Sequence, residues 1–226
     1  MQHLSTHISI VLDQRLYLKD PQSSAIGLEI VRQSVDMIAT SGLDHFTFKK
    51  LAQVLKSTES TIYRYFQNKH QLAMYLASWH WSHLEWRIAF ATANIQDPQQ
   101  RLEKALLEIS TWVKDNPRTK YLDESKLQRL VLTEGFKAFV PVELNKSDKE
   151  GYLSAYSFLC ARLSDIIQSA IKHCAQPKAL AVMIIESVHH QMYLQMHLPQ
   201  LSEIKMKDTE MVQFITTHLL KSTTKK

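Results

Sequence analysis

The chain has 226 residues, 45% of them hydrophobic, which is enough for a core in one large domain or two smaller ones. Only 4 glycines and 6 prolines interrupt it, and this scarcity predicts an all-α protein. A formal net charge of +5 permits a nucleic-acid partner without requiring one. No apolar run reaches the ~20 residues of a membrane span and no signal-peptide pattern is present, so we expect a cytoplasmic protein without a membrane partner.

Residues 1–22 are expected to form an extension that precedes the core fold. Their apolar positions follow neither the helical nor the strand period over so short a span. Arg15 and Lys19 are offset by two aspartates, which makes the extension a poor candidate for an arm in the DNA minor groove. We predict instead that it packs on its own domain or on a partner.

A first helix is predicted from Ser23 or Ser24 to about Thr40, with Gly42 placed to end it. Its buried stripe is expected to consist of Ile26, Ile30, Val31, Val35 and Ile38.

Two short helices follow, joined by a turn at residues 56–58. Leu51, Ala52 and Leu55 share one face of the first, and Ile62 and Phe66 are four residues apart on the second. Thr58 is suited to cap the second helix through its side-chain oxygen. If that helix buries Ile62 and Phe66, it presents Glu59, Ser60, Tyr63 and Arg64 outward, as the recognition helix of a helix-turn-helix does.

The charge of this segment agrees with DNA binding. Between His45 and Gln71, five basic residues stand against Glu59 alone, so the segment carries +4 of the chain's +5. Phosphate contacts require such a local basic surface. Charge alone equally fits a pair of solvated surface helices.

The residues at 47–72, T-F-K-K-L-A-x-x-L-x-x-T-x-x-T-I-Y-R-Y-F-x-N-K-x-x-L, resemble the DNA-binding signature of the TetR/AcrR family of bacterial transcriptional regulators. The most specific part is the stretch from Thr61 to Leu72. In the turn, Lys56 and Ser57 stand where the family usually has glycine followed by an apolar residue. The resemblance implies a three-helix head at 23–67 and a larger helical ligand-binding and dimerisation domain at 68–226.

The resemblance also implies roles for single residues. Thr47, Thr61, Tyr63, Arg64 and Lys69 match positions that contact phosphate, and Lys49, Glu59 and Ser60 match positions that face base edges. The implied function is that of a homodimeric regulator, a repressor, on a palindromic operator in double-stranded DNA, released by a small-molecule effector.

Asn68 and Gln71 predict a capped start for a long helix behind the recognition helix. Trp79, His83, Trp86 and Phe90 fall within one narrow stripe of it. Each of these side chains could simply belong to the core. The family resemblance favours an effector site for an apolar or aromatic molecule, with His83 as its polar contact.

The remaining chain predicts further helices. One starts at Asp97-Pro98 and runs past Val113, and another spans Tyr121 to about Val140. Residues 145–150 are expected to form a loop. Helices are then predicted at Tyr152–Cys174, Pro177–His197 and Met206–Leu220, and apolar residues on several faces of the first two predict a dimer interface.

Other chemistry is weakly supported by the sequence. Glu186, His189, His190 and His197 lie within helical reach of one another, but their spacing is not that of a known metal site. Nucleotide-binding and hydrolase motifs are missing, so we predict no cofactor, no metal, no catalytic residue and no enzymatic activity. The alternatives kept open are a scaffold that binds another protein and a helical metal-dependent enzyme.

Overall fold

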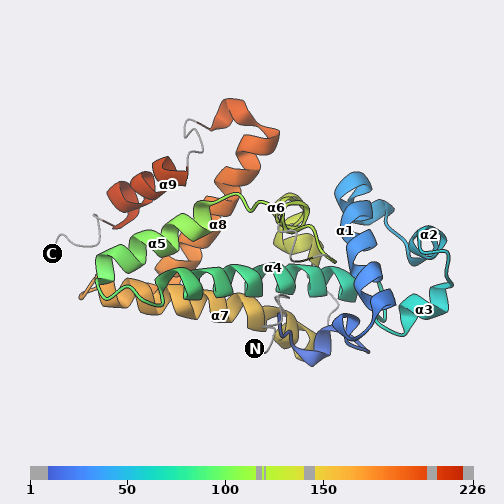
Figure 1. The fold of residues 1–226 in the computed structure, drawn as a ribbon. Helices are drawn as coiled ribbons and strands as arrows, with labels where there is room; N and C mark the ends of the chain where they lie inside the picture. The colour runs from blue at the N-terminus through green and yellow to red at the C-terminus, as the bar shows by residue number, and fades with distance from the viewer. Residues whose placement is uncertain (1–9, 116–118, 120, 140–145, 203–207, 221–226) are drawn as a thin grey trace, which may run out of the picture. The chain divides into compact units, whose positions relative to one another are not determined.

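The computed structural model describes residues 10–115, 119, 121–139, 146–202 and 208–220, and all regular structure within them is helical, as predicted (Figure 1). The chain divides into two compact units. Unit 1 comprises Met1–Trp81 and Val113–Ala155, and unit 2 comprises Ser82–Trp112 and Tyr156–Lys226. In the described part of the chain, no helix combines the length and apolar character needed to cross a membrane.

Helix α1 (Ala25–His45) opens unit 1. The Ser24 hydroxyl accepts a hydrogen bond from the Gly27 N–H at 3.2 Å, which satisfies one of the free donors of the first turn. Four residues of the predicted stripe, Ile30, Val31, Val35 and Ile38, are buried, whereas Ile26 is only half-buried. Gly42 adopts φ +77°, as its placement predicted, but the chain makes one more short turn before α1 ends at His45.

Helices α2 (Phe48–Val54) and α3 (Glu59–Tyr63) form the predicted helix-turn-helix. The Thr47 hydroxyl caps α2 by accepting from the Lys50 N–H at 3.3 Å. The predicted Thr58 side-chain cap is wrong, because the Thr58 hydroxyl pairs with that of Thr61 at 3.2 Å and makes no cap bond. Lys56, in the position where the family usually has glycine, adopts φ +49°.

The segment before α1 packs on unit 1. It contains two short 3-10 turns, η1 (Gln14–Leu16) and η2 (Pro21–Ser23), and buries Leu12 and Leu16. The Leu18 N–H donates to the carbonyl of Tyr65, next to α3, at 2.8 Å. A Cβ on Gly27 would lie 2.3 Å from the Pro21 carbonyl oxygen, so only glycine permits this close approach. The expectation that the extension packs on its own domain is confirmed for its described residues.

Helix α4 (Lys69–Thr92) starts at Asn68, whose Oδ1 accepts from the Gln71 N–H at 2.9 Å, as predicted. The Gln71 side chain reaches back to the Gln67 N–H at 2.7 Å. Residues 69–81 of this helix belong to unit 1 and residues 82–92 to unit 2. Nearly all of its unit 1 portion is buried, so this part of α4 belongs to the core of that unit.

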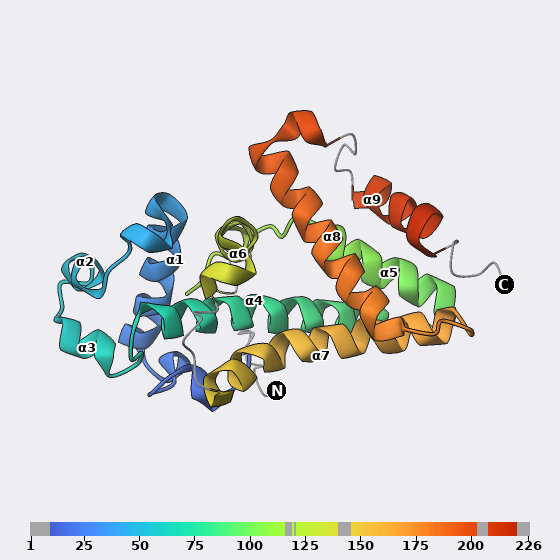
Figure 2. The same cartoon turned by 180° about the vertical axis from the view of Figure 1, so that it is seen from behind.

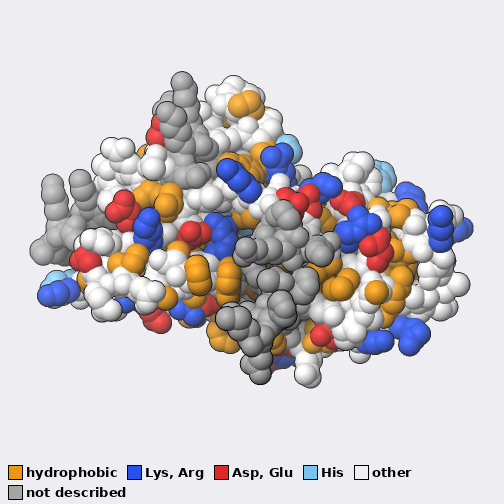
Figure 3. Space-filling view, in the orientation of Figure 1, with side chains coloured by type: hydrophobic (Ala, Val, Ile, Leu, Met, Phe, Trp, Pro, Cys, Tyr) orange, Lys and Arg blue, Asp and Glu red, His pale blue; other side chains and the backbone are white. Residues whose placement is uncertain are grey.

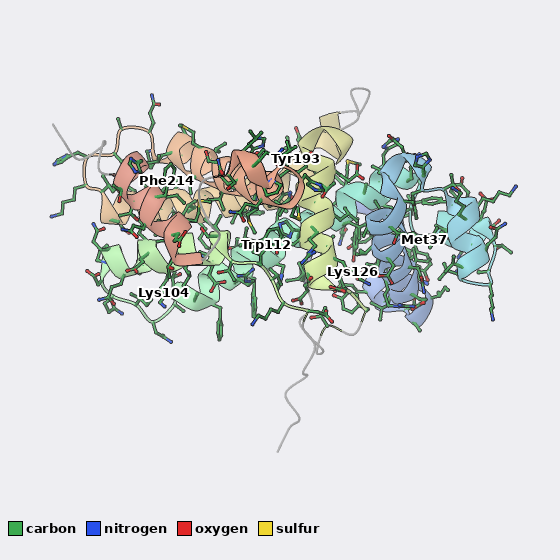
Figure 4. All side chains as sticks on the ribbon, turned by 90° about the horizontal axis from the view of Figure 1, so that it is seen from above. Met37, Lys104, Trp112, Lys126, Tyr193 and Phe214 are labelled. Atoms are coloured by element: carbon green, nitrogen blue, oxygen red, sulfur yellow. The ribbon has the colours of Figure 1, made fainter. Side chains whose placement is uncertain are left out.

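Helix α6 (Glu124–Phe139) packs against α1 within unit 1. Lys126, labelled in Figure 4, pairs with Asp36 of α1 at 2.6 Å. Glu134 accepts a hydrogen bond from the Leu43 N–H at 3.1 Å. The far end of α1 is therefore held by a polar contact from α6.

Unit 2 contains α5 (Pro98–Ser110), α8 (Pro177–His197), η3 (Pro199–Leu201), α9 (Asp208–Phe214) and a π-helical stretch η4 (Ile215–Leu220). It also contains most of α7 (Lys146–Ala170). Asp97 caps α5 as predicted, and α8 has the predicted bounds. Figure 2 shows α5, α8 and α9 from behind.

Several predicted boundaries after residue 97 are wrong, among them the end of α7, which lies at Ala170 and not at Cys174. Helix α5 ends at Ser110 and leaves out Val113, whose N–H donates instead to the Gln128 side chain at 2.8 Å. Residues 146–150 belong to α7, whereas the sequence predicted a loop. A run of polar residues without proline does not stop a helix when tertiary packing supports the turns that follow. Asn145 lies outside the described residues.

Candidate nucleic-acid interface

The outward face of α3 is the first candidate surface. Ile62 and Phe66 are fully buried beneath it, which fixes the rotation of this five-residue helix. The predicted contact residues Glu59, Ser60 and Arg64 are consequently exposed, and Tyr63 is 48% exposed. A helix presenting these side chains to solvent matches the geometry of a recognition helix.

Exposed basic side chains surround α3. The predicted base-facing residue Lys49 lies on α2 beside Lys50, and Lys56 lies in the turn. Figure 3 shows Lys and Arg side chains gathered over the α2 and α3 end of unit 1. This arrangement supplies the positive charge that attracts a phosphate backbone.

The Tyr63 ring is held in place by packing. Its centroid lies 5.2 Å from that of Phe48 in an edge-to-face arrangement. Phe48 in turn contacts the fully buried Phe46 in the same manner, at 6.3 Å. The phenol therefore projects from a fixed ring, which lowers the entropy lost when its hydroxyl makes a hydrogen bond.

The Thr47 hydroxyl retains its donor, whereas Thr61 shares a hydrogen bond with Thr58 in which either hydroxyl can be the donor. Thr47 uses an oxygen lone pair to accept from the Lys50 N–H, and Thr61 accepts from the Ser57 hydroxyl at 3.0 Å. A hydroxyl also carries one hydrogen to donate, and phosphate oxygens accept hydrogen bonds. Capping of α2 is thus compatible with a phosphate contact by Thr47.

Lys69 has a structural role that sequence reasoning missed. Its ammonium donates to the carbonyls of Leu43 and Asp44, at 3.0 and 3.3 Å. An ammonium has three donors, so two of them bind the last turn of α1 and one is left for another acceptor. The phosphate contact predicted for Lys69 stays a prediction, and this residue also ties the start of α4 to the end of α1.

Three of the four predicted effector-site residues form a stack on the unit 2 portion of α4. The rings of His83 and Trp86 lie 6.0 Å apart and those of Trp86 and Phe90 5.6 Å apart, both nearly parallel. Phe90 is 75% exposed and Trp86 39%, whereas His83 is buried. We call these three residues the aromatic ladder.

Trp79, the fourth predicted residue, lies in the unit 1 portion of α4. It is buried, and its indole N–H donates to the Tyr121 hydroxyl at 3.4 Å. The Tyr121 hydroxyl donates in turn to the Gln22 side chain at 3.3 Å. These contacts give Trp79 a structural function in joining α4 to the N-terminal segment.

His83 is the titratable group of the ladder. Burial lowers its pKa to about 4, and the neighbouring Arg87 charge adds to this effect. The imidazole is therefore neutral at physiological pH and can act as a hydrogen-bond donor or acceptor without carrying charge.

The comparisons with known proteins bear first on the head. Residues 30–76 match the family described as "Bacterial regulatory proteins, tetR family", a range that contains most of α1, both helices of the helix-turn-helix and the start of α4. The chain carries a TetR-family DNA-binding domain. No curated protein matches the chain.

Solved structures share the fold over most of the chain. The fatty acid degradation regulator FadR from Bacillus halodurans aligns with a TM-score of 0.62 at 14% identity, over 84% of this chain and 98% of its own. AibR in complex with isovaleryl coenzyme A and operator DNA gives 0.58 at 15%, over 82% and 93%. The TetR family transcriptional regulator PfmR from Thermus thermophilus gives 0.58 at 11%, over 84% and 98%.

The histidines of α8 do not form a metal site in the part of the chain that the structure describes, which contains no group of three suitable ligands. Glu186 instead accepts a hydrogen bond from the Tyr156 hydroxyl at 2.5 Å. His189 is buried, while His190 and His197 are exposed. Burial lowers the pKa of His189 to about 4, so this imidazole is neutral at physiological pH.

Proposed function

We propose that this TetR-family protein is a homodimeric transcriptional repressor that binds a palindromic operator and is released by a small apolar or aromatic effector. The observation that carries the proposal is the exposed face of α3, with Glu59, Ser60, Tyr63 and Arg64 directed to solvent above a fully buried Ile62. Residues 23–67 serve as the DNA-binding head, and residues 68–226 serve effector binding and dimerisation.

The head residues fall into two groups according to the part of the DNA that each is proposed to contact. Thr47, Thr61, Tyr63, Arg64 and Lys69 contact phosphates, and Lys49, Glu59 and Ser60 face the bases. Glu59 is an acceptor near a polyanion, so it is favourable only where it accepts from a cytosine amino group. Changing Glu59 to Gln should relax base preference at one position in each half-site, and uniform tightening on all sequences would contradict this role.

Exposed apolar side chains in unit 2 support a homodimer. Phe158 on α7 is 69% exposed and Met183 on α8 is 56% exposed, whereas other apolar residues of the same helices, such as Leu159 and Ile184, are buried. A two-fold axis would place the same surface of each copy against the other. Equilibrium sedimentation at micromolar concentration should show a dimer, and a monomer would also remove the basis for a palindromic operator.

The aromatic ladder supports the effector assignment. Trp86 and Phe90 offer a stacked apolar surface, and neutral His83 lies next to it. The solved structure of AibR contains both isovaleryl coenzyme A and operator DNA, so a protein of this fold can hold both. A ligand that binds the DNA-incompetent state better, with a coupling of about 1–3 kcal/mol, would lower operator affinity roughly 5- to 150-fold.

Footprinting on the DNA that flanks the gene encoding this chain tests the operator. The expected result is protection of two half-sites related by two-fold symmetry, at a spacing of about one helical turn or a multiple of it. Weak binding that is indifferent to sequence even at low salt would favour the alternative, a scaffold that retains the head but acts on another protein.

Variants of the ladder test the effector assignment separately. His83→Ala should leave operator binding nearly intact and impair release by the effector. Loss of operator binding in the unliganded variant, together with a large drop in melting temperature, would show that His83 serves the core.

A further inference from the structure

A cavity of about 610 Å³ lies within unit 2, between α5 and the segment formed by α9 and η4. Figures 1 and 2 both show α9 beside α5. No residue of the DNA-binding head or of the aromatic ladder contributes to its lining. Its volume falls within the roughly 300–1,000 Å³ that is typical of small-molecule sites.

Two helical stripes face each other across this cavity. The residues of each stripe follow the spacing of a single helix face. The α5 stripe consists of Gln99, Leu102, Glu103, Leu106 and Leu107, and the C-terminal stripe consists of Thr209, Val212, Gln213, Thr216 and Thr217. Facing helices normally fill the space between them with interlocking side chains to near-crystalline density. Here short threonines stand opposite leucines, which explains why a cavity is left.

The two walls differ in chemistry. Leu102, Leu106 and Ile171 supply a buried aliphatic wall. The opposite wall offers threonine hydroxyls and the amide of Gln213. The Thr216 hydroxyl donates to the Val212 carbonyl at 2.8 Å, so its oxygen remains able to accept a hydrogen bond from a ligand.

The lining carries no excess of charge. Its charged residues are Glu103 and Lys104, which are adjacent, opposite in sign and exposed (Lys104 is labelled in Figure 4). An ionised head group would gain no dedicated counter-charge from this lining. The lining therefore favours an uncharged ligand.

The backbone of the C-terminal stripe is itself unusual. Thr216 and Thr217 belong to the π-helical stretch η4, which follows directly on α9. Wide π turns are rare in proteins and occur frequently at functional sites. This feature is independent of the cavity's composition and falls on the same residues.

We infer that the cavity between α5 and the C-terminal stripe is a second binding site, which takes an uncharged aliphatic molecule with one hydrogen-bonding head group. The chain of the ligand lies on the α5 leucines, and its head meets the threonine and glutamine side chains. The inference does not depend on the proposed DNA-binding function, because binding to the cavity is measured without DNA.

Calorimetric titration of the full chain with three probes of equal length tests the inference. The probes are 1-nonanol, nonanoate and nonylammonium at neutral pH. The expected result is that 1-nonanol binds and raises the melting temperature, while each ionised probe binds at least tenfold more weakly. Failure of 1-nonanol to bind, or tighter binding of an ionised probe, would overturn the inference.

A matched pair of variants locates the site. Gln213→Trp fills the polar wall, and Gln168→Trp makes the same change at an exposed position of α7 outside the lining. The first should weaken 1-nonanol binding at least tenfold, and the second less than twofold. Thr209→Leu, a smaller filling change on the same stripe, repeats the test without an indole. Binding in both lining variants equal to that of Gln168→Trp would place the ligand elsewhere and refute the site.

Discussion

The carboxylate of Glu134, on α6, accepts a hydrogen bond from the backbone N–H of Leu43 at 3.1 Å, one residue after the left-handed Gly42. The carbonyl of the same Leu43 accepts from the Lys69 ammonium at 3.0 Å. The last turn of α1 is thus held at the Leu43 N–H by α6 and at the Leu43 carbonyl by Lys69, the first residue of α4. These contacts fix the connection from which α2 and α3 start.

Glu134→Ala should lower the free energy of unfolding by about 1–3 kcal/mol, because it leaves the N–H of a buried residue without its acceptor. Glu134→Gln keeps a carbonyl oxygen at the same place and should lose less. Lys126→Ala removes only a half-exposed ion pair between the same two helices and should cost about 0–1 kcal/mol. Urea unfolding measures all three. If both Ala variants lost the same free energy of unfolding, the Glu134 hydrogen bond would contribute no more than the Lys126 ion pair.

Lys56→Gly should stabilise the protein by roughly 0.5–1 kcal/mol. A side chain at φ +49° is strained by about 1–2 kcal/mol, and part of the relief is offset by the greater freedom of glycine in the unfolded chain. Lys49→Gly removes the same charge from a helical position and should destabilise by about 1 kcal/mol. Opposite signs in urea unfolding would confirm the strain, whereas a loss of stability in both variants would contradict it.

The protein should become less stable as the pH falls from about 6.5 to 4. Burial, with a smaller effect of Arg87, lowers the pKa of His83 to about 4 from an ordinary 6.5. As the pH falls through this range, the unfolded chain binds a proton that the folded chain does not bind, and this favours unfolding. The stabilisation that comes from neutral His83 is fully present above pH 6.5, and by pH 4 it has fallen by up to about 3 kcal/mol. Burial also lowers the pKa of His189 to about 4, which adds a second loss with the same sign.

His83→Phe removes one of these two titrations while keeping a ring to stack on Trp86. The difference in denaturant midpoint between pH 7.5 and pH 5 should therefore be smaller than the parent's. His173→Phe, at an exposed position, serves as the control and should keep the parental difference. An undiminished difference in His83→Phe would show that another group governs acid sensitivity.

Arg64→Ala should weaken binding to every DNA sequence and reduce the slope of log affinity against log salt by about one, because one phosphate contact is lost. Lys172→Ala, an exposed change in unit 2, should leave the slope unchanged. Fluorescence anisotropy with operator and scrambled duplexes provides both readings. A loss confined to the operator would mean that Arg64 reads a base.

Local signals predicted the head well. The spacing of Leu51, Ile62 and Phe66, the Asn68 cap and the position of Gly42 are all set within a few residues of the chain, and all were found in the structure. Predictions were weaker where a side chain has two possible partners or where tertiary packing extends a helix. The Thr58 hydroxyl has a competing partner in Thr61, and a polar stretch before Gly151 continues as helix.

The candidate sites show the same limit. Periodicity placed His83, Trp86 and Phe90 on one face, and their stacking follows from it. The contact of Trp79 with Tyr121 spans 42 residues, and that of Lys69 with Leu43 spans 26. The cavity beneath α9 arises from short side chains meeting long ones on another helix. Such pairings cannot be read from the spacing of either helix alone.

Unit 1 is assembled from two stretches of chain, with residues 82–112 of unit 2 between them. During synthesis, α1 to α3 leave the ribosome well before Glu134 exists to bind the Leu43 N–H. A nascent or prematurely terminated chain that ends before α6 therefore contains α3 but lacks the Glu134 contact that holds the end of α1. Such fragments should bind DNA more weakly than the full-length chain does.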